Sequence, residues 1–152
     1  MAGRRLVFGR DRSMTKNPKV VRLRNKLTEL EQLHQVVDDF SRQHGLSARV
    51  LSAVSHSLEE ILTNIISYAY EDCREHQITV SLALSEGRLE LQVEDDGRPF
   101  NPQHHPSPDT SVPLEDKPVG GLGIHIVRTM MDEMKYRRES GKNVLVLKKK
   151  VA

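Results

Sequence analysis

The succession of helical and alternating segments places the tightest limit on how this 152-residue chain can fold. From 28 to about 44 and from 47 to about 70, apolar residues step by three and four, which predicts two amphipathic helices. Residues 78–84 and 89–93 alternate instead, and the polar stretch 85–88 between them predicts a hairpin turn. A helix pair followed by a β-hairpin is therefore expected.

The other periodic segments complete the order of elements. Residues 19–24 have the pattern of an edge strand, and strands are also predicted at 133–138 and 144–149. A third helix is predicted to follow Gly123. This order predicts an α+β fold, a two-layer sandwich in which helices cover one face of a mixed, mostly antiparallel sheet.

Polar residues and a glycine mark the ends of the first two helices. Thr28 and Glu31 are spaced as a capping box, which predicts that the first helix begins at Thr28. Gly45 is placed to end that helix, and Ser47 is placed to begin the next one.

Composition excludes several classes of protein. Hydrophobic residues make up 37% of the chain and charged residues 29%, which is ordinary for a globular domain. No apolar run approaches the ~20 residues needed to cross a bilayer, and no secretory h-region follows the basic start, so no membrane contact is expected. The single cysteine, Cys73, cannot form an internal disulfide, which favours a cytoplasmic location.

Charge is distributed unevenly along the chain. Residues 1–26 carry nine basic side chains and one acidic one, a net charge of +8 that leaves −6 for the rest. We expect 1–17 to be a flexible, solvated arm on a single domain at 18–152, because charge runs are usually solvated. A nucleic-acid tether is the alternative, disfavoured because Phe8 is the only aromatic residue of the arm.

A proline-rich stretch interrupts the periodic pattern. Residues 98–119 hold six of the seven prolines and show no helical or strand period. A long aperiodic segment inside a compact domain is usually functional, so we expect a loop or lid over a site.

The first of three short blocks spans residues 60–64 (EILTN), on the second predicted helix. Glu60 and Asn64 are four apart, so their side chains share one face. A carboxamide oxygen suits Mg²⁺, and a nearby carboxylate can take a proton from an attacking hydroxyl. Alone, such a pair would be an ordinary helix surface, and Glu59 competes with Glu60 for the role of base.

The second block, Asp95-Asp96-Gly97, follows the strand predicted at 89–93. Two adjacent acids at a strand end need solvent or a partner, so one of them is expected to have a dedicated donor. Alone, the block would be a polar turn.

The third block, residues 120–123 (GGLG), precedes a predicted helix. Backbone N–H groups at a helix start can hold phosphate. No Gly-Lys-Ser/Thr follows and no strand leads into the block, so it is neither a Walker loop nor a Rossmann turn.

Together, the three blocks resemble the N, G1 and G2 boxes of the GHKL ATPases, and the chain is most similar to the stand-alone anti-sigma-factor serine kinases among them. The resemblance covers roughly residues 18–150. It implies that ATP binds with Mg²⁺, that Glu60 is the general base and that Asn64 holds the metal. The nucleotide-binding residues that it further implies are Asp95 and Gly97 at the adenine, and Gly121, Leu122 and Gly123.

Two positions depart from the pattern of the family. Pro99, followed by Phe100, stands where the second glycine of Asp-x-Gly-x-Gly is expected, which fits the anti-sigma-factor branch. Asn143 stands where many relatives have a threonine near adenine, so its contact with adenine is left open.

The resemblance also implies partners. They are a STAS-domain anti-sigma-factor antagonist as phosphoryl acceptor, a sigma factor or analogous regulator, and a second copy of the chain in a homodimer. One alternative is a histidine-kinase catalytic domain, disfavoured because no phosphoacceptor hairpin precedes residue 28. Another is a non-catalytic, nucleotide-gated binding module.

Overall fold

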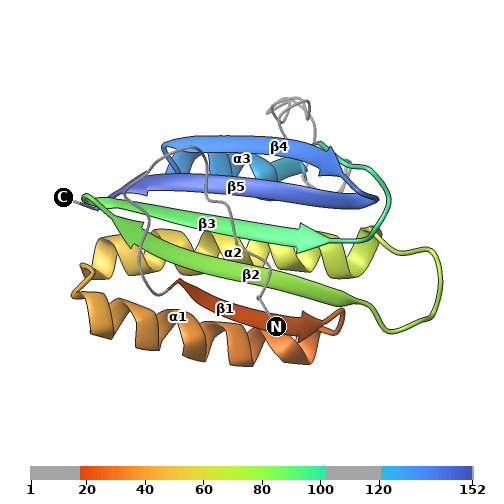
Figure 1. Cartoon of the computed structure of the whole chain (residues 1–152), viewed down its shortest axis with the longest axis horizontal. Coiled ribbons are helices and arrows are strands. Elements are labelled where there is room, and N and C mark those ends of the chain that lie inside the picture. Colours follow the sequence, from red (N-terminus) through yellow and green to blue (C-terminus); the bar gives the residue numbers. More distant parts are fainter. Residues whose placement is uncertain (1–17, 102–120, 152) are drawn as a thin grey trace.

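The computed structural model describes residues 18–101 and 121–151. These residues form three helices, a five-stranded sheet and one short 3₁₀ turn before the first helix, arranged as in Figure 1. In chain order the elements are β1 (Lys19–Arg24), the 3₁₀ turn η1 (Leu27–Glu29), α1 (Leu30–His44), α2 (Ala48–Tyr68), β2 (Gln77–Ser85), β3 (Arg88–Asp95), α3 (Gly121–Met130), β4 (Glu133–Glu139) and β5 (Lys142–Lys150).

The strands form one sheet in the order β1-β2-β3-β5-β4. All four neighbouring pairs in the described part of the chain are antiparallel, so the mixed sheet expected from the sequence is in fact an antiparallel one. Its central pairing joins β3 to β5, two strands separated by α3 and β4 in the chain. Segments far apart in the sequence therefore meet at the middle of the sheet.

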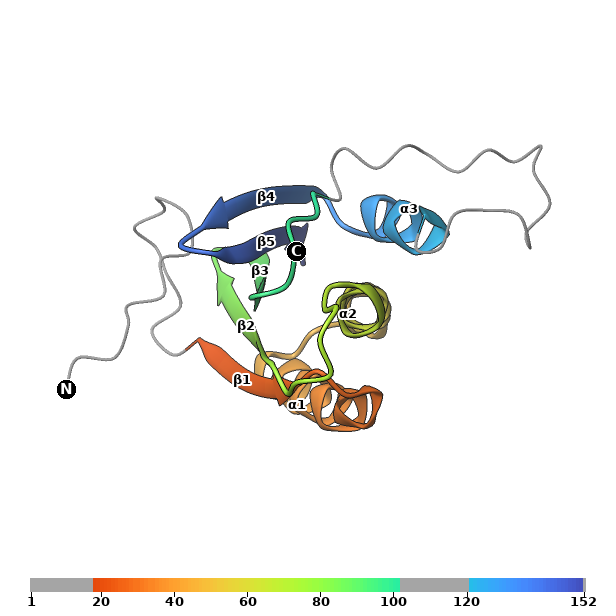
Figure 2. The same cartoon turned by 90° about the vertical axis from the view of Figure 1, so that its right-hand side faces the viewer.

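The helices lie together on one side of the sheet, as Figure 2 shows, which confirms the two-layer arrangement. The inner sheet face is apolar, with Val80 opposite Val93 and Leu91 opposite Leu147. Leu58 of α2 is fully buried against it, and truncating such a side chain to alanine typically costs ~2–5 kcal/mol. This packing fixes α2 across the sheet.

Two of the three predicted helix-end signals are confirmed. Gly45 ends α1 in the left-handed region with φ 63°, and Ser47 Oγ accepts a hydrogen bond of 3.2 Å from Val50 N at the start of α2. The capping box is wrong: Thr28 lies inside the 3₁₀ turn, and Glu29, which precedes α1, makes no side-chain cap. The tight turn carries the chain from β1 into α1 instead.

The third helix also begins earlier than predicted. It starts at Gly121, so Gly123 lies in its first turn and not before it. The expected arm at 1–17 and most of the expected lid at 98–119 lie outside the residues that the structure describes. No helix in the described ranges is long and apolar enough to cross a membrane.

Candidate nucleotide-binding site

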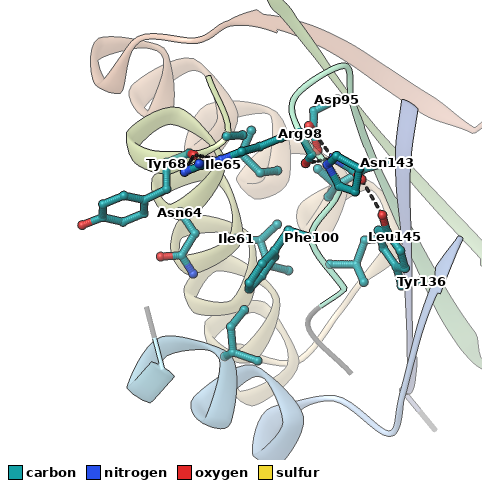
Figure 3. Close-up of a pocket in the computed structure, with 14 residues that line it drawn as sticks. Ile61, Asn64, Ile65, Tyr68, Asp95, Arg98, Phe100, Tyr136, Asn143 and Leu145 are labelled. Atoms are coloured by element: carbon teal, nitrogen blue, oxygen red, sulfur yellow. Dashed lines mark hydrogen bonds between the residues drawn. The ribbon is translucent and has the colours of Figure 1, made fainter. Parts of the chain in front are cut away.

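A cavity of about 470 Å³ opens between α2, α3 and the ends of β3, β4 and β5 (Figure 3). It is mostly apolar, and a small number of polar groups converge on it, which is typical of a small-molecule site. Asn64 comes from α2, Asp95 from the end of β3 and Asn143 from the start of β5. The first and second sequence blocks are thus brought to one cavity.

Asp95 is the most buried acidic side chain of this site, with 5% of its surface exposed. Its Oδ1 accepts hydrogen bonds from Gly97 N at 2.8 Å and from Asn143 Nδ2 at 3.0 Å. Burial raises the pKa of the Asp95 carboxyl, and these two hydrogen bonds act in the opposite direction. The expectation of a dedicated donor applies to Asp95, while Asp96 is exposed and its Oδ2 lies 3.2 Å from His76 Nδ1.

Position 97 has no room for a side chain, so glycine is required there. A Cβ at this position would lie 2.6 Å from Ala69 Cβ and 2.8 Å from Ala69 O, so only glycine lets the chain pass the end of α2. Arg98 fixes the same crossing: its N–H donates to Ala69 O at 3.0 Å, and its Nε donates to Tyr68 O at 3.0 Å. The turn after β3 is therefore attached to the last residues of α2.

Asn64 lines the cavity from α2 (Figure 3). Its Nδ2 atom is buried and has no hydrogen-bond partner among the described residues. A buried amide without a partner is costly, so this position is suited to a bound polar ligand.

Glu60 and Glu59 have different environments. Glu59 is exposed and lies 3.7 Å from His34 Nε2 of α1. Glu60 is half-buried, and its Oε2 occupies the position that a Cβ of Gly123 would take. Glu60 therefore faces the first turn of α3, next to the cavity but not among the residues that line it.

The third block forms the start of α3. Gly121 and Leu122 open this helix, and Gly123 lies against Glu60. A helix start presents unpaired backbone N–H groups and the positive end of the helix dipole. Both features favour an anionic group at this end of the site.

Sequence reasoning missed three residues of the site. Tyr136 and Arg138 of β4 hydrogen-bond the carboxamide oxygen of Asn143, at 2.6 Å and 3.1 Å. Tyr68 also lines the cavity, with 45% of its surface exposed. The helical pattern around Tyr68 did not mark it as a site residue. Tyr136 and Arg138 lie in a strand whose sequence is ordinary for an exposed, charged strand.

Comparison with known proteins identifies the family of this fold. The family model of the histidine kinase-like ATPase domain matches residues 23–149. The serine-protein kinases RsbW of Bacillus mycoides, Bacillus cereus and Bacillus anthracis are each 37% identical over 97 residues. That stretch is 60% of this chain and 59% of each relative, so the chain spans about three fifths of the length of the relatives it matches.

A solved structure agrees with the architecture. The crystal structure of the RsbU and RsbW domains of a Mycobacterium tuberculosis protein covers 90% of this chain and 33% of that chain, with a TM-score of 0.65 and 14% identity. At this identity the likeness shows the fold alone. With the family model, it confirms the resemblance read from the three sequence blocks: the chain belongs to the histidine kinase-like ATPase family.

Proposed function

We propose that the protein is an ATP-dependent serine/threonine-protein kinase of the anti-sigma-factor type. The observation that carries the proposal is the pairing, in one cavity, of the buried Asp95 carboxylate with the unpartnered Asn64 amide. The family consists of ATP-binding domains, and the RsbW relatives are named serine-protein kinases, which supports the same reading.

Adenine suits the Asp95 end of the cavity. Oδ1 of Asp95 already accepts two hydrogen bonds, and among the described residues no donor reaches Oδ2. An exocyclic amino group can donate to this free carboxylate oxygen. Ile61, Val93 and Leu145 supply apolar walls for the faces of a base.

Asn64 suits a magnesium–phosphate ligand. Its carboxamide offers a neutral oxygen, the kind of ligand that Mg²⁺ takes in addition to phosphates and water. No group of three or more His, Cys, Asp or Glu side chains in the described ranges could hold a metal ion. Asn64 and the phosphates of ATP would hold the metal, which would neutralise charge on the transferring phosphoryl group. The N-terminal turn of α3, from Gly121 through Leu122 to Gly123, would bind the phosphates.

Glu60 is the proposed general base. Its carboxylate accepts the hydroxyl proton of the substrate serine as the serine oxygen bonds to the γ-phosphorus. The bond from that phosphorus to the bridging oxygen breaks, and ADP leaves. Glu59 is less suited to this role, because its Oε2 lies 3.7 Å from His34 Nε2 of α1.

The proposed phosphoryl acceptor is a STAS-domain anti-sigma-factor antagonist. A sigma factor or analogous regulator is the alternate partner, and the kinase acts as a homodimer. These partners rest on the resemblance to the anti-sigma-factor kinases and on the RsbW relatives.

Glu60→Gln tests the proposal, with Glu59→Gln as the matched control on the same helix. Both proteins receive γ-labelled ATP, Mg²⁺ and a purified STAS-domain protein from the source cell. We expect Glu60→Gln to lower transfer by ~10²–10⁴-fold while ADP affinity, measured by calorimetry, stays near wild type. Glu59→Gln should leave both quantities unchanged.

Each contrary outcome has a distinct meaning. Full transfer by Glu60→Gln would remove Glu60 from the role of base. An acid-labile label on the acceptor would indicate a histidine kinase in place of a serine/threonine kinase. A wild-type protein that binds ADP and labels nothing would be a nucleotide-gated binding module.

A further inference from the structure

Asn143 is a buried carboxamide whose whole hydrogen-bonding capacity is used at the end of the cavity. It lies directly opposite Asp95 in the β3–β5 pairing, and 6% of its surface is exposed. Its Nδ2 donates to Asp95 Oδ1 at 3.0 Å and to Arg98 O at 2.9 Å, with a longer contact of 3.5 Å to Gly97 O. Figure 3 shows this group beside Asp95.

The neighbours of Asn143 fix the direction of its amide. Arg138 Nη1, which can only donate, lies 3.1 Å from Oδ1, and the Tyr136 hydroxyl lies 2.6 Å from the same atom. On the other side, a carboxylate and the backbone carbonyl of Arg98 can only accept. The amide nitrogen must therefore face Asp95, because a flipped amide would break the contacts with Arg138, with Asp95 and with the Arg98 carbonyl.

The fixed amide determines which part of Asp95 a ligand can use. With Gly97 N and Asn143 Nδ2 on Oδ1, that oxygen is saturated with donors. Oδ2 has no donor among the described residues, and Asp95 lines the cavity. When the 6-substituent of a purine faces Oδ2, an ionised carboxylate accepts a 6-amino group and repels a 6-keto oxygen.

We propose that Asn143 is a positioning and specificity residue that holds Asp95 ionised and in place, so that the site takes an amino-purine and rejects an oxo-purine. The inference rests on the proposed function, because it concerns the same nucleotide site. Asn143 acts through Asp95 and need not touch the base. The sequence left open whether Asn143 contacts adenine, and this indirect role does not require that contact.

Loss of the amide has a defined effect on Asp95. Burial raises the pKa of Asp95, and the hydrogen bond from Asn143 lowers it. Without that bond, the pKa of Asp95 rises further, so the carboxyl becomes neutral at a higher pH than in the wild type. A neutral carboxyl can donate its proton to the keto oxygen of guanine, and discrimination between the two bases then falls.

The test is Asn143→Ala, titrated calorimetrically with ADP and with GDP from pH ~4, near the ordinary pKa of a carboxyl, up to pH ~8. We expect ADP to bind about tenfold more weakly, as for loss of one hydrogen bond to a charged group. The pH below which ADP affinity declines should move upward, and the preference for ADP over GDP should shrink. Lys142→Ala is the matched control, since the neighbouring Lys142 is only half-buried and pairs with Glu94 at 3.8 Å.

A double variant separates positioning from general structural damage. On the background of Asp95→Asn, the change Asn143→Ala should have no further effect on the ADP/GDP ratio. If Asn143→Ala does not fold, Asn143→Thr, whose hydroxyl can make one of the bonds, is measured in its place. The same upward move of the pH profile, smaller in size, is expected.

The proposal is overturned if the variants bind ADP with the wild-type pH profile and base preference. An equal loss at every pH, with the ADP/GDP ratio unchanged, also overturns it, because a purely structural role would give that result. Wild-type protein that binds neither nucleotide overturns the proposed function together with this inference. Wild-type binding of ADP with an unaffected variant overturns the inference alone.

Discussion

The carboxylate of Glu60 on α2 lies where a side chain of Gly123 on α3 would begin. At this point the Glu60 carboxylate of α2 packs against the backbone of Gly123 in α3, which has no side chain. Because the overlapping atom is the end of a flexible side chain, a larger residue at 123 can be accommodated if Glu60 moves.

Gly123→Ala is expected to reduce phosphoryl transfer without unfolding the protein. Alanine favours a helix over glycine by ~1 kcal/mol, which offsets the displacement of Glu60. We expect an unchanged or slightly higher melting temperature and at least about tenfold slower transfer, since a small misplacement of a reacting group is costly. Gly45→Ala is the control: its positive φ predicts lower stability by ~1 kcal/mol with transfer unaffected.

Gly97→Ala, in contrast, is expected to lower stability as well as ligand binding. Here the added Cβ meets the Cβ and the backbone oxygen of Ala69, neither of which can rotate away. We expect a loss of ~1–3 kcal/mol in the free energy of unfolding, together with weaker ADP binding. Urea denaturation and calorimetry measure the two effects, and wild-type stability in this variant would show that the end of α2 yields.

Asn64→Leu tests whether Asn64 lowers the stability of the unliganded protein in order to provide a ligand-binding group. Leucine has a similar size and removes the buried Nδ2 that has no partner among the described residues. We expect the unliganded protein to gain ~1–3 kcal/mol, the cost of an unsatisfied buried polar group. Magnesium should then no longer strengthen ATP binding. A less stable variant would mean that Asn64 has a role in the unliganded fold.

His76 gives the folded protein a pH-dependent contribution to stability. Its Nε2 lies 2.6 Å from Asp72 Oδ1 and its Nδ1 lies 3.2 Å from Asp96 Oδ2, while Tyr70 stacks on the ring at 4.2 Å. The hydrogen bond with Asp72 is the main cause of the raised pKa of His76, with Asp96 adding to it. The charged imidazolium is thus favoured in the folded state.

The sign of this effect follows from the raised pKa. The contribution is fully present below the unfolded pKa of ~6.5 and is lost as pH rises through the higher folded value. We expect the urea midpoint of the wild type to fall as pH rises above ~6.5, with a shallower fall in His76→Gln. His125→Gln, at an exposed site on α3, should keep the wild-type slope.

Local signals in the sequence predicted the elements well, because their causes are local. Gly45 and Ser47 mark helix ends through their own backbone and side chain. The prediction that the first helix begins at Thr28 was wrong, because the capping pattern does not distinguish the start of an α-helix from a 3₁₀ turn. The start of α3 was placed late because glycine is a weak helix former, and the prediction did not allow two glycines inside a first turn.

The candidate site was predictable only in part, for a different reason. Asp95 was singled out by its own block, but its partner Asn143 lies 48 residues away. The two meet because β3 pairs with β5 in one particular register, and alternation predicts strands without fixing their neighbours. Arg138 and Tyr136 enter the site through the same pairing at the next strand.

The pairing of β3 with β5 also determines at which point of chain synthesis the site can form. Because Asp95 depends on a residue made much later by the ribosome, a nascent chain that ends before Asn143 holds its acidic side chain without the amide that orients it. Such a chain carries the helix with Glu60 and Asn64 but not the strand that completes the cavity. On the proposed function, a copy that ends before Asn143 would lack the complete nucleotide site and would not compete for ATP.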